Sequence, residues 1–69
     1  MNPTRFKNLR KKFGFTQREL AQKLNKAESS IRMWELGKSK PVSDTLLKLA
    51  DCFDVTVDYL LGHSDTHQR

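Results

Sequence analysis

The sequence predicts an all-α fold of about five short helices, and three observations support this prediction. Apolar residues recur three and four positions apart, as on one face of a helix. Helix-capping residues and glycines divide the chain at short intervals. No segment alternates strictly between apolar and polar residues over the length of a strand, and β-branched residues are few. The 69 residues are therefore expected to form one small α-helical domain.

The first helix is expected over residues 3–13. Asn2 is a typical N-cap, and the proline that follows suits the first helical position because its missing N–H group would have no partner there. Gly14 can take the left-handed conformation that ends a helix. The apolar stripe of this helix consists of Phe6, Leu9 and Phe13.

The second helix is expected over residues 17–24, and its start is the strongest local signal in the sequence. Thr16 and Glu19 stand three positions apart, which is the spacing of a capping box. Asn25 tolerates a positive φ angle, so the helix is expected to end there.

Three more short helices are expected over residues 28–36, 44–53 and 57–61. Gly37 and Gly62 are expected to end the first and last of these. Ser43 is expected to cap the middle one, and Thr56 the last one.

Composition bounds the class of protein. The 13 Lys and Arg residues outnumber the 8 Asp and Glu residues, which gives a formal net charge of +5. No run approaches the roughly 18 apolar residues of a membrane span, and no signal peptide is visible. The single Cys52 excludes an internal disulfide and suits a reducing compartment. We expect a soluble, cytoplasmic protein with a folded domain over residues 1–62 and a polar, disordered tail over 63–69.

The charge is unevenly distributed along the chain. Residues 1–40 contain 11 basic and 3 acidic residues, a net charge of +8, whereas residues 41–69 contain 2 basic and 5 acidic residues, a net charge of −3. The first segment is expected to attract a polyanion, and the second is expected to pack behind it. On charge alone, an ordinary solvated surface is the alternative.

Residues 17–36 have the features of a helix-turn-helix unit, two short helices around a three-residue turn. A close crossing needs a small residue at the contact, such as Ala21, and a residue tolerant of positive φ in the turn, such as Asn25. The apolar residues that would lock the pair are Leu20, Leu24, Ile31 and Trp34. From these features alone, a helical hairpin in a small bundle is the alternative.

The outward face of the helix over 28–36 favours a DNA-reading role. In a bundle this face would be rich in Lys and Glu, whereas here it carries groups compatible with the major groove. Arg32 suits guanine O6 and N7, and Glu28 suits the amino group of cytosine. Ala27 and Met33 suit a thymine methyl group. For each single residue, simple solvent exposure is the alternative.

Phosphate contacts are expected on both sides of this helix. The capped helix start at Thr16 and Gln17 offers backbone N–H groups, and the loop of Lys38, Ser39 and Lys40 is basic.

Six stretches of the sequence follow one another in an order specific to one family. They are residues 6–10, 15–24, 30–35, 37–41, 45–50 and 55–62. Over residues 5–62 the chain resembles the lambda-repressor-like helix-turn-helix family, the DNA-binding domain of phage repressors and Cro proteins.

This resemblance implies a compact five-helix domain that reads base edges with the helix over 28–36, as a symmetric dimer on a palindromic operator. It implies that Gln17 contacts phosphate and the outermost base. The other residues that it places against the groove are Ala27, Glu28, Ser29, Arg32 and Met33. The residues that it places against the DNA backbone are Ser30, Lys38, Ser39 and Lys40. It also implies a structural pair of Arg10 and Glu35 between the first and third helices.

The chain departs from the family pattern at several positions. Lys26 replaces an apolar turn residue and is expected to add a phosphate contact. Ala27 replaces a Ser or Thr cap, a loss of about 1 kcal/mol. Val42 replaces the usual cap of the fourth helix, which is why Ser43 is expected to take over. Leu36 replaces a polar residue and leaves an apolar spot beside Met33.

The sequence thus predicts a transcriptional regulator, a phage or bacterial repressor that binds double-stranded operator DNA near the nucleoid. The expected partners are a second copy of the chain on DNA and a protein antirepressor or inducer. The alternatives are an antitoxin of the same fold and a protein-interaction module that has lost DNA binding and uses Met33 and Leu36 as its contact surface. The substitution Arg32→Ala would separate the two classes, because a regulator should lose discrimination at one base pair and such a module should not.

Enzymatic and metal chemistry are not supported by the sequence. No Ser/His/Asp arrangement and no glycine-rich phosphate loop is present, so we expect neither catalytic residues nor a cofactor. His63 and His67 have i, i+4 spacing and Cys52 is a third candidate ligand, but no CxxC or HExxH spacing accompanies them, so no metal site is expected. Cys52 is expected to be a small, partly buried residue of the fourth helix.

Overall fold

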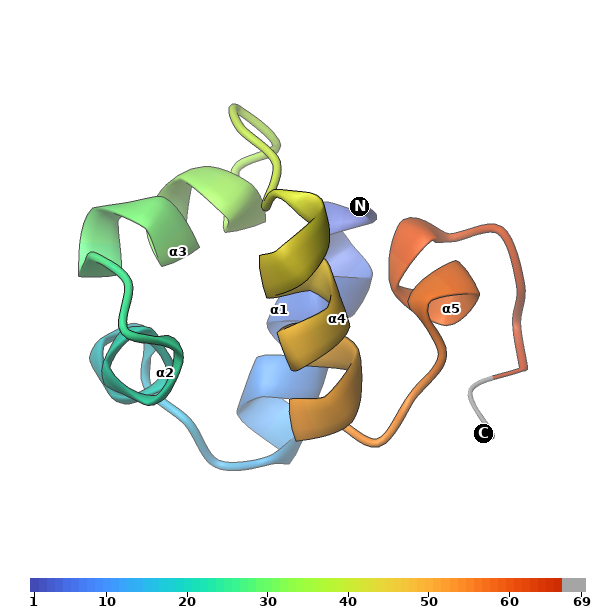
Figure 1. The fold of residues 1–69 in the computed structure, drawn as a ribbon, viewed down its shortest axis with the longest axis horizontal. Coiled ribbons are helices and arrows are strands. Elements are labelled where there is room, and N and C mark those ends of the chain that lie inside the picture. Colours follow the sequence, from blue (N-terminus) through green and yellow to red (C-terminus); the bar gives the residue numbers. More distant parts are fainter. Residues whose placement is uncertain (67–69) are drawn as a thin grey trace.

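Five helices joined by short connections make up residues 1–66, the part of the chain that the computed structural model describes (Figure 1). They are α1 (Pro3–Lys12), α2 (Gln17–Leu24), α3 (Glu28–Glu35), α4 (Ser43–Cys52) and α5 (Val57–Leu61). No strand occurs in these residues, and the predicted all-α fold is confirmed.

Three of the helices begin with the side-chain caps expected from the sequence. The Asn2 side chain accepts a hydrogen bond from the third residue of α1, and Thr56 does the same for α5. At α2 both halves of the capping box form: Glu19 N–H donates to Thr16 Oγ1 at 3.0 Å, and Thr16 N–H donates to Glu19 Oε1 at 2.8 Å. The N–H group and then the hydroxyl of Thr16 lower the pKa of the Glu19 carboxyl, because both stabilise its charged form.

The expected cap of the fourth helix is wrong. Val42, not Ser43, is the N-cap, and Ser43 is already helical. The extended backbone of Val42 lets its carbonyl accept the first helical hydrogen bond from Leu46 N–H at 2.9 Å, so the helix starts one residue early without a side-chain cap. It correspondingly ends at Cys52. The third helix also ends one residue earlier than expected, at Glu35.

Left-handed residues end the helices where the sequence suggests a break. Asn25 has φ 57° and ψ 46° at the end of α2. Gly37 has φ +73°, and a Cβ atom there would lie 3.3 Å from Pro3 Cγ, so the end of α3 can lie against the start of α1. Asp54, after α4, also has a positive φ of 53°, which is not among the breaks expected from the sequence.

The core joins all five helices around Phe6. This ring is fully buried on α1 and packs edge-on against Trp34 of α3 and against Phe53 after α4, with centroid distances of 6.0 and 6.3 Å. The other buried apolar residues are Leu9, Leu20, Ala21, Leu24, Ile31, Leu49, Ala50, Val55 and Leu60. Helices this short are unstable alone, so this shared core holds each of them in place.

Phe13, expected in the apolar stripe of the first helix, is 44% exposed. The helix ends at Lys12, one residue before the predicted end, and Phe13 forms its C-cap. Its ring lies outside the core and rests on Phe53 at 5.4 Å.

The helices are arranged along the longest axis of the molecule. α2 and α3 lie at one end and α5 at the other, with α1 and α4 between them (Figure 1). At the α5 end, Arg5 stacks on the Tyr59 ring at 4.1 Å and donates to the carbonyls of Tyr59 and Ser64 at 3.0 and 2.8 Å. The predicted tail over 63–69 stays a prediction, and its residues 67–69 lie outside the described ones.

Truncating Ile31 tests the contact between α2 and α3. Ile31 is fully buried, so Ile31→Ala is expected to reduce the free energy of unfolding by about 2–5 kcal/mol, measured by urea denaturation. Leu47→Ala, at a 56% exposed site on α4, is the control and should change it by less than about 0.5 kcal/mol. Equal losses in both variants would contradict the assigned core.

The capping box predicts a pH dependence. Because the pKa of Glu19 is lowered in the folded chain, its stabilising effect is complete above the ordinary pKa and disappears as the pH falls through the lowered value. Glu19→Gln keeps an acceptor but does not titrate. The stability of the unmodified chain relative to Glu19→Gln should therefore fall as the pH drops from above the ordinary glutamate pKa of 4.5 through the lowered value. Urea denaturation across this range measures it, and a constant difference would refute the effect.

Candidate nucleic-acid interface

α2 and α3 cross closely around a hydrogen-bonded turn. Ala21 of α2 and Ile31 of α3 are buried, as expected from the sequence. Residues 25–27 form the turn, in which Lys26 N–H donates to the Ala21 carbonyl at 2.9 Å and Asn25 N–H donates to that of Gln22 at 3.2 Å. The backbone closes the turn, although Lys26 and Ala27 are unusual there. α3 therefore has a fixed angle to α2.

The predicted base-reading residues share the exposed side of α3. Glu28, Ser29, Arg32 and Met33 are exposed, while Ile31 and Trp34 on the opposite side are buried. Ala27 is the exposed N-cap of α3 and provides no side-chain cap. The apolar spot beside this face also exists, since Met33 is 37% and Leu36 59% exposed. All the residues predicted to face the groove are therefore accessible to solvent along one side of α3.

The predicted phosphate-contacting residues lie at both ends of α3 and at the start of α2. Lys26 is exposed in the turn that precedes α3, and residues 38–40 are exposed in the loop that follows it. Thr16 is exposed, but its side chain is engaged in the capping box. Ser30 is half-buried.

Gln17 is less available than the sequence suggested. It is half-buried, and its Nε2 donates to Oε1 of Glu35 at 3.1 Å. Eighteen residues separate the two, so no local periodicity reveals this contact. The proximity of the start of α2 to the end of α3 in the folded unit is the signal that could have indicated it.

Arg10 and Glu35 form a buried ion pair between α1 and α3. Their side chains are 9% and 5% exposed. Arg10 Nε donates to Glu35 Oε2, and Nη2 donates to Oε1 at 3.2 Å. Arg10 Nη1 also donates to the Phe15 carbonyl at 2.8 Å. The paired geometry and the extra acceptor satisfy both buried charges, and they connect α1, α3 and the connection that leads into α2.

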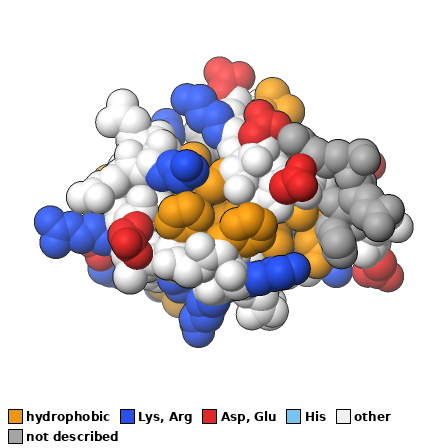
Figure 2. Space-filling model, turned by 90° about the horizontal axis from the view of Figure 1, so that it is seen from below, with side chains coloured by type: hydrophobic (Ala, Val, Ile, Leu, Met, Phe, Trp, Pro, Cys, Tyr) orange, Lys and Arg blue, Asp and Glu red, His pale blue; other side chains and the backbone are white. Residues whose placement is uncertain are grey.

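Ion pairing leaves most of the N-terminal positive charge at the surface. Arg10 is neutralised by Glu35, Arg5 pairs with Asp65 at 3.3 Å, and Arg32 lies 4.0 Å from Glu28. The other basic residues of 1–40 are all exposed: Lys7, Lys11, Lys12, Arg18, Lys23, Lys26, Lys38 and Lys40. The side away from α3 is mixed, with a central group of hydrophobic side chains among basic and acidic ones (Figure 2).

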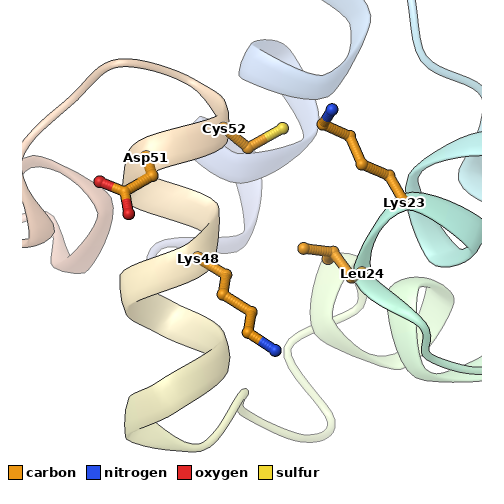
Figure 3. A pocket seen from close by; sticks show the side chains of 5 residues that line it. All are labelled: Lys23, Leu24, Lys48, Asp51 and Cys52. Atoms are coloured by element: carbon orange, nitrogen blue, oxygen red, sulfur yellow. The ribbon is translucent and has the colours of Figure 1, made fainter.

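A pocket of about 340 Å³ lies between α2 and α4 (Figure 3). Lys23 and Leu24 line it from α2, and Lys48, Asp51 and Cys52 line it from α4. Cys52 is half-buried, and burial raises the pKa of its thiol, an effect that the charge of Lys23 partly opposes. The thiol is thus mainly protonated near neutral pH and a weak nucleophile.

Neither a metal cluster nor a membrane span is found in the described part of the chain. In residues 1–66, no group of three or more His, Cys, Asp or Glu side chains is placed to hold a metal ion, and His67 of the candidate set lies outside these residues. None of the helices described is long and apolar enough to cross a membrane.

The comparison with known families identifies this arrangement. The model of the family described as "Helix-turn-helix" matches residues 6–60, which include all of α2 and α3. The chain belongs to the helix-turn-helix family. The resemblance to the phage repressor and Cro type is thereby confirmed, and the matched residues form a helix-turn-helix domain and not a catalytic one.

Several curated proteins are similar to this helix-turn-helix domain. The "HTH-type transcriptional regulator ImmR" of Bacillus subtilis is 40% identical over 65 residues, 94% of this chain and 51% of that protein. AnsR of the same organism, another HTH-type transcriptional regulator, is 38% identical over 99% of this chain and 59% of that protein. The "Cryptic phage CTXphi transcriptional repressor RstR" of Vibrio cholerae is 30% identical over 94% of this chain and 58% of that protein. The chain spans about half the length of these relatives.

Removing one partner of the buried pair should weaken the helix-turn-helix domain strongly. Glu35→Ala leaves the Arg10 charge buried without its carboxylate and is expected to cost about 3–5 kcal/mol of unfolding free energy. Glu28→Ala removes the carboxylate of the exposed Glu28–Arg32 pair and is expected to cost at most about 1 kcal/mol. Denaturant unfolding compares the two, and a Glu35 effect as small as that of Glu28 would show that the pair does not hold α1 to α3.

Proposed function

We propose that the chain is the DNA-binding domain of a transcriptional repressor of phage or bacterial type, which binds a palindromic operator as a dimer. The exposed side of α3 carries this proposal, because its opposite side is anchored through Ile31 and Trp34 in the core. A helix held in this way presents its outer residues at a constant angle to the major groove. The printed names of ImmR and RstR support a regulatory role.

Base recognition is assigned to the outer residues of α3. Arg32 can donate two hydrogen bonds to guanine, and Glu28 can accept one from the amino group of cytosine. Their side chains lie 4.0 Å apart, so they would contact neighbouring bases. Because Glu28 repels phosphate, it contributes to specificity more than to affinity. Ala27 and Met33 are exposed on the same helix and suit thymine methyl groups. Ser29 lies beside them.

Phosphate contacts would flank this helix. Lys26 precedes α3, and Lys38 and Lys40 follow it, so positive charge lies at both ends of the reading surface. Thr16, Ser30 and Ser39 would add polar contacts to the DNA backbone. Charge at both ends favours docking with α3 between the two phosphate strands of the major groove.

Symmetric binding would place two copies of α3 about 34–36 Å apart, in successive major grooves on one side of the duplex. The second copy of the chain is the proposed partner on DNA, and an antirepressor protein or inducer would release it. A protein with this function would be located in the cytoplasm, bound to the DNA of the nucleoid.

Selection of bound sequences from random duplex DNA tests the proposed function. The expected result is a motif with twofold symmetry, whose half-sites lie one helical turn apart. A footprint should then show twofold-related protection. Recovery of no enriched sequence would overturn specific DNA binding, and an asymmetric motif would overturn the dimer.

Two substitutions separate base reading from phosphate contact. Arg32→Ala is expected to remove discrimination at one base pair, worth about 1–3 kcal/mol. Lys40→Ala should weaken binding to all sequences alike and lower the salt slope of the binding constant by about 1. Titrations of the selected site and of single-base variants at several salt concentrations measure both effects. If Arg32→Ala leaves discrimination unchanged and binding is only weak and salt-sensitive, a protein-interaction module is the better assignment.

A further inference from the structure

Gln17 reaches from the start of α2 to the last residue of α3. Its Nε2 donates to Glu35 Oε1 at 3.1 Å. A carboxylate only accepts hydrogen bonds, so the NH2 group of the amide, and not its carbonyl, must face Glu35. The chemistry of the contact therefore fixes the orientation of the amide.

The fixed amide keeps part of its hydrogen-bonding capacity for another molecule. One N–H group is used by Glu35, and Gln17 Oε1 has no hydrogen-bond partner in residues 1–66. Within the same residues no buried side-chain nitrogen or oxygen lacks a partner, so Oε1 must reach the surface. Gln17 thus offers one donor and one acceptor in a set direction. A Gln side chain uses this pair on the edge of adenine, and the donor alone suits phosphate.

Glu35 is itself held too firmly to follow a moving amide. Its side chain is 5% exposed, and both oxygens accept hydrogen bonds from Arg10. Arg10 is in turn tied to the carbonyl of Phe15, two residues before Gln17, at 2.8 Å. The support of Gln17 therefore includes α1, α3 and the connection into α2.

We propose that Glu35 is a positioning residue for DNA recognition, which holds the amide of Gln17 in its binding orientation before DNA arrives. The role rests on the proposed function, because Gln17 is a predicted DNA contact. A side chain that is ordered in advance does not have to be immobilised on binding. The same contact also fixes the start of α2 against the end of α3, the two places where the protein would touch the DNA backbone.

The test must remove the acceptor at position 35 without leaving a buried charge. Both comparison proteins therefore carry Arg10→Met, one with Glu35→Gln and one with Glu35→Met. Replacing a buried ion pair with uncharged groups of similar size is often tolerated, and thermal unfolding checks that both proteins fold. Gln at position 35 retains a carbonyl acceptor for Gln17, whereas Met does not.

Two measurements are made on each protein. Without DNA, 15N relaxation of the Gln17 side-chain amide should show an ordered group with Glu35→Gln and a mobile one with Glu35→Met. With the selected DNA, the Met variant should bind about threefold to tenfold more weakly than the Gln variant, the size expected for immobilising one long side chain. Adding Gln17→Ala to both should abolish this difference, which a general change in helix packing would not do.

Equal mobility of the Gln17 amide in the two variants would overturn the positioning role, whatever the DNA result. Equal affinities, or a difference that persists with Gln17→Ala, would overturn its contribution to recognition. Failure of the unmodified chain to select any DNA sequence would instead refute the proposed function, and the relaxation data would still show whether position 35 orders Gln17.

Discussion

The domain depends on one buried carboxylate, that of Glu35, at the point where three segments meet. Desolvating a carboxylate is costly unless opposite charge and donors surround it. Arg10 supplies both from α1, and Gln17 adds a donor from α2. Because these partners come from different helices, satisfying the charge requires a particular arrangement of all three. The apolar core supplies the buried surface, and the charge of Glu35 is satisfied only when α1, α2 and α3 are packed so that Arg10 and Gln17 reach it.

The sequence predicted features that depend on neighbouring residues. The side chains of three N-cap residues accept hydrogen bonds from the backbone N–H three positions further along: Asn2, Thr16 and Thr56. Because the partners are so close in sequence, residue type and spacing alone predict these caps. The starts of α3 and α4 lack such a bond. The boundary at Val42 differs from the expectation because its N-cap is marked only by an extended backbone and by a carbonyl that accepts the first helical hydrogen bond, which any residue can provide. The exposure of Phe13 differs from the expectation because apolar spacing does not show where a helix ends.

In the candidate interface too, features set by neighbouring residues were predictable from the sequence, and features set by tertiary contacts were not. The exposed side of α3 was predictable from the helical period, since Ile31 and Trp34 define the buried side. The engagement of Gln17 was not, because it depends on how the end of α3 meets the start of α2. The pairing of Glu28 with Arg32 follows the i, i+4 spacing that the sequence contains, whereas the prediction treats the two residues as separate base contacts. Sequence reasoning therefore located the surface and missed the contacts that orient its side chains.

The uncapped start of α3 has a consequence for local motion. α2 begins with a complete capping box, whereas Ala27 provides no side-chain acceptor to the first turn of α3. The amide protons of that turn consequently exchange with solvent through smaller opening free energies than those at the start of α2. α3 is anchored at its far end by Trp34 and Glu35, so its C-terminal half has more tertiary contacts to hold it than its uncapped first turn. Under the proposed function, differences between DNA sequences would be accommodated first at Ala27 and Glu28.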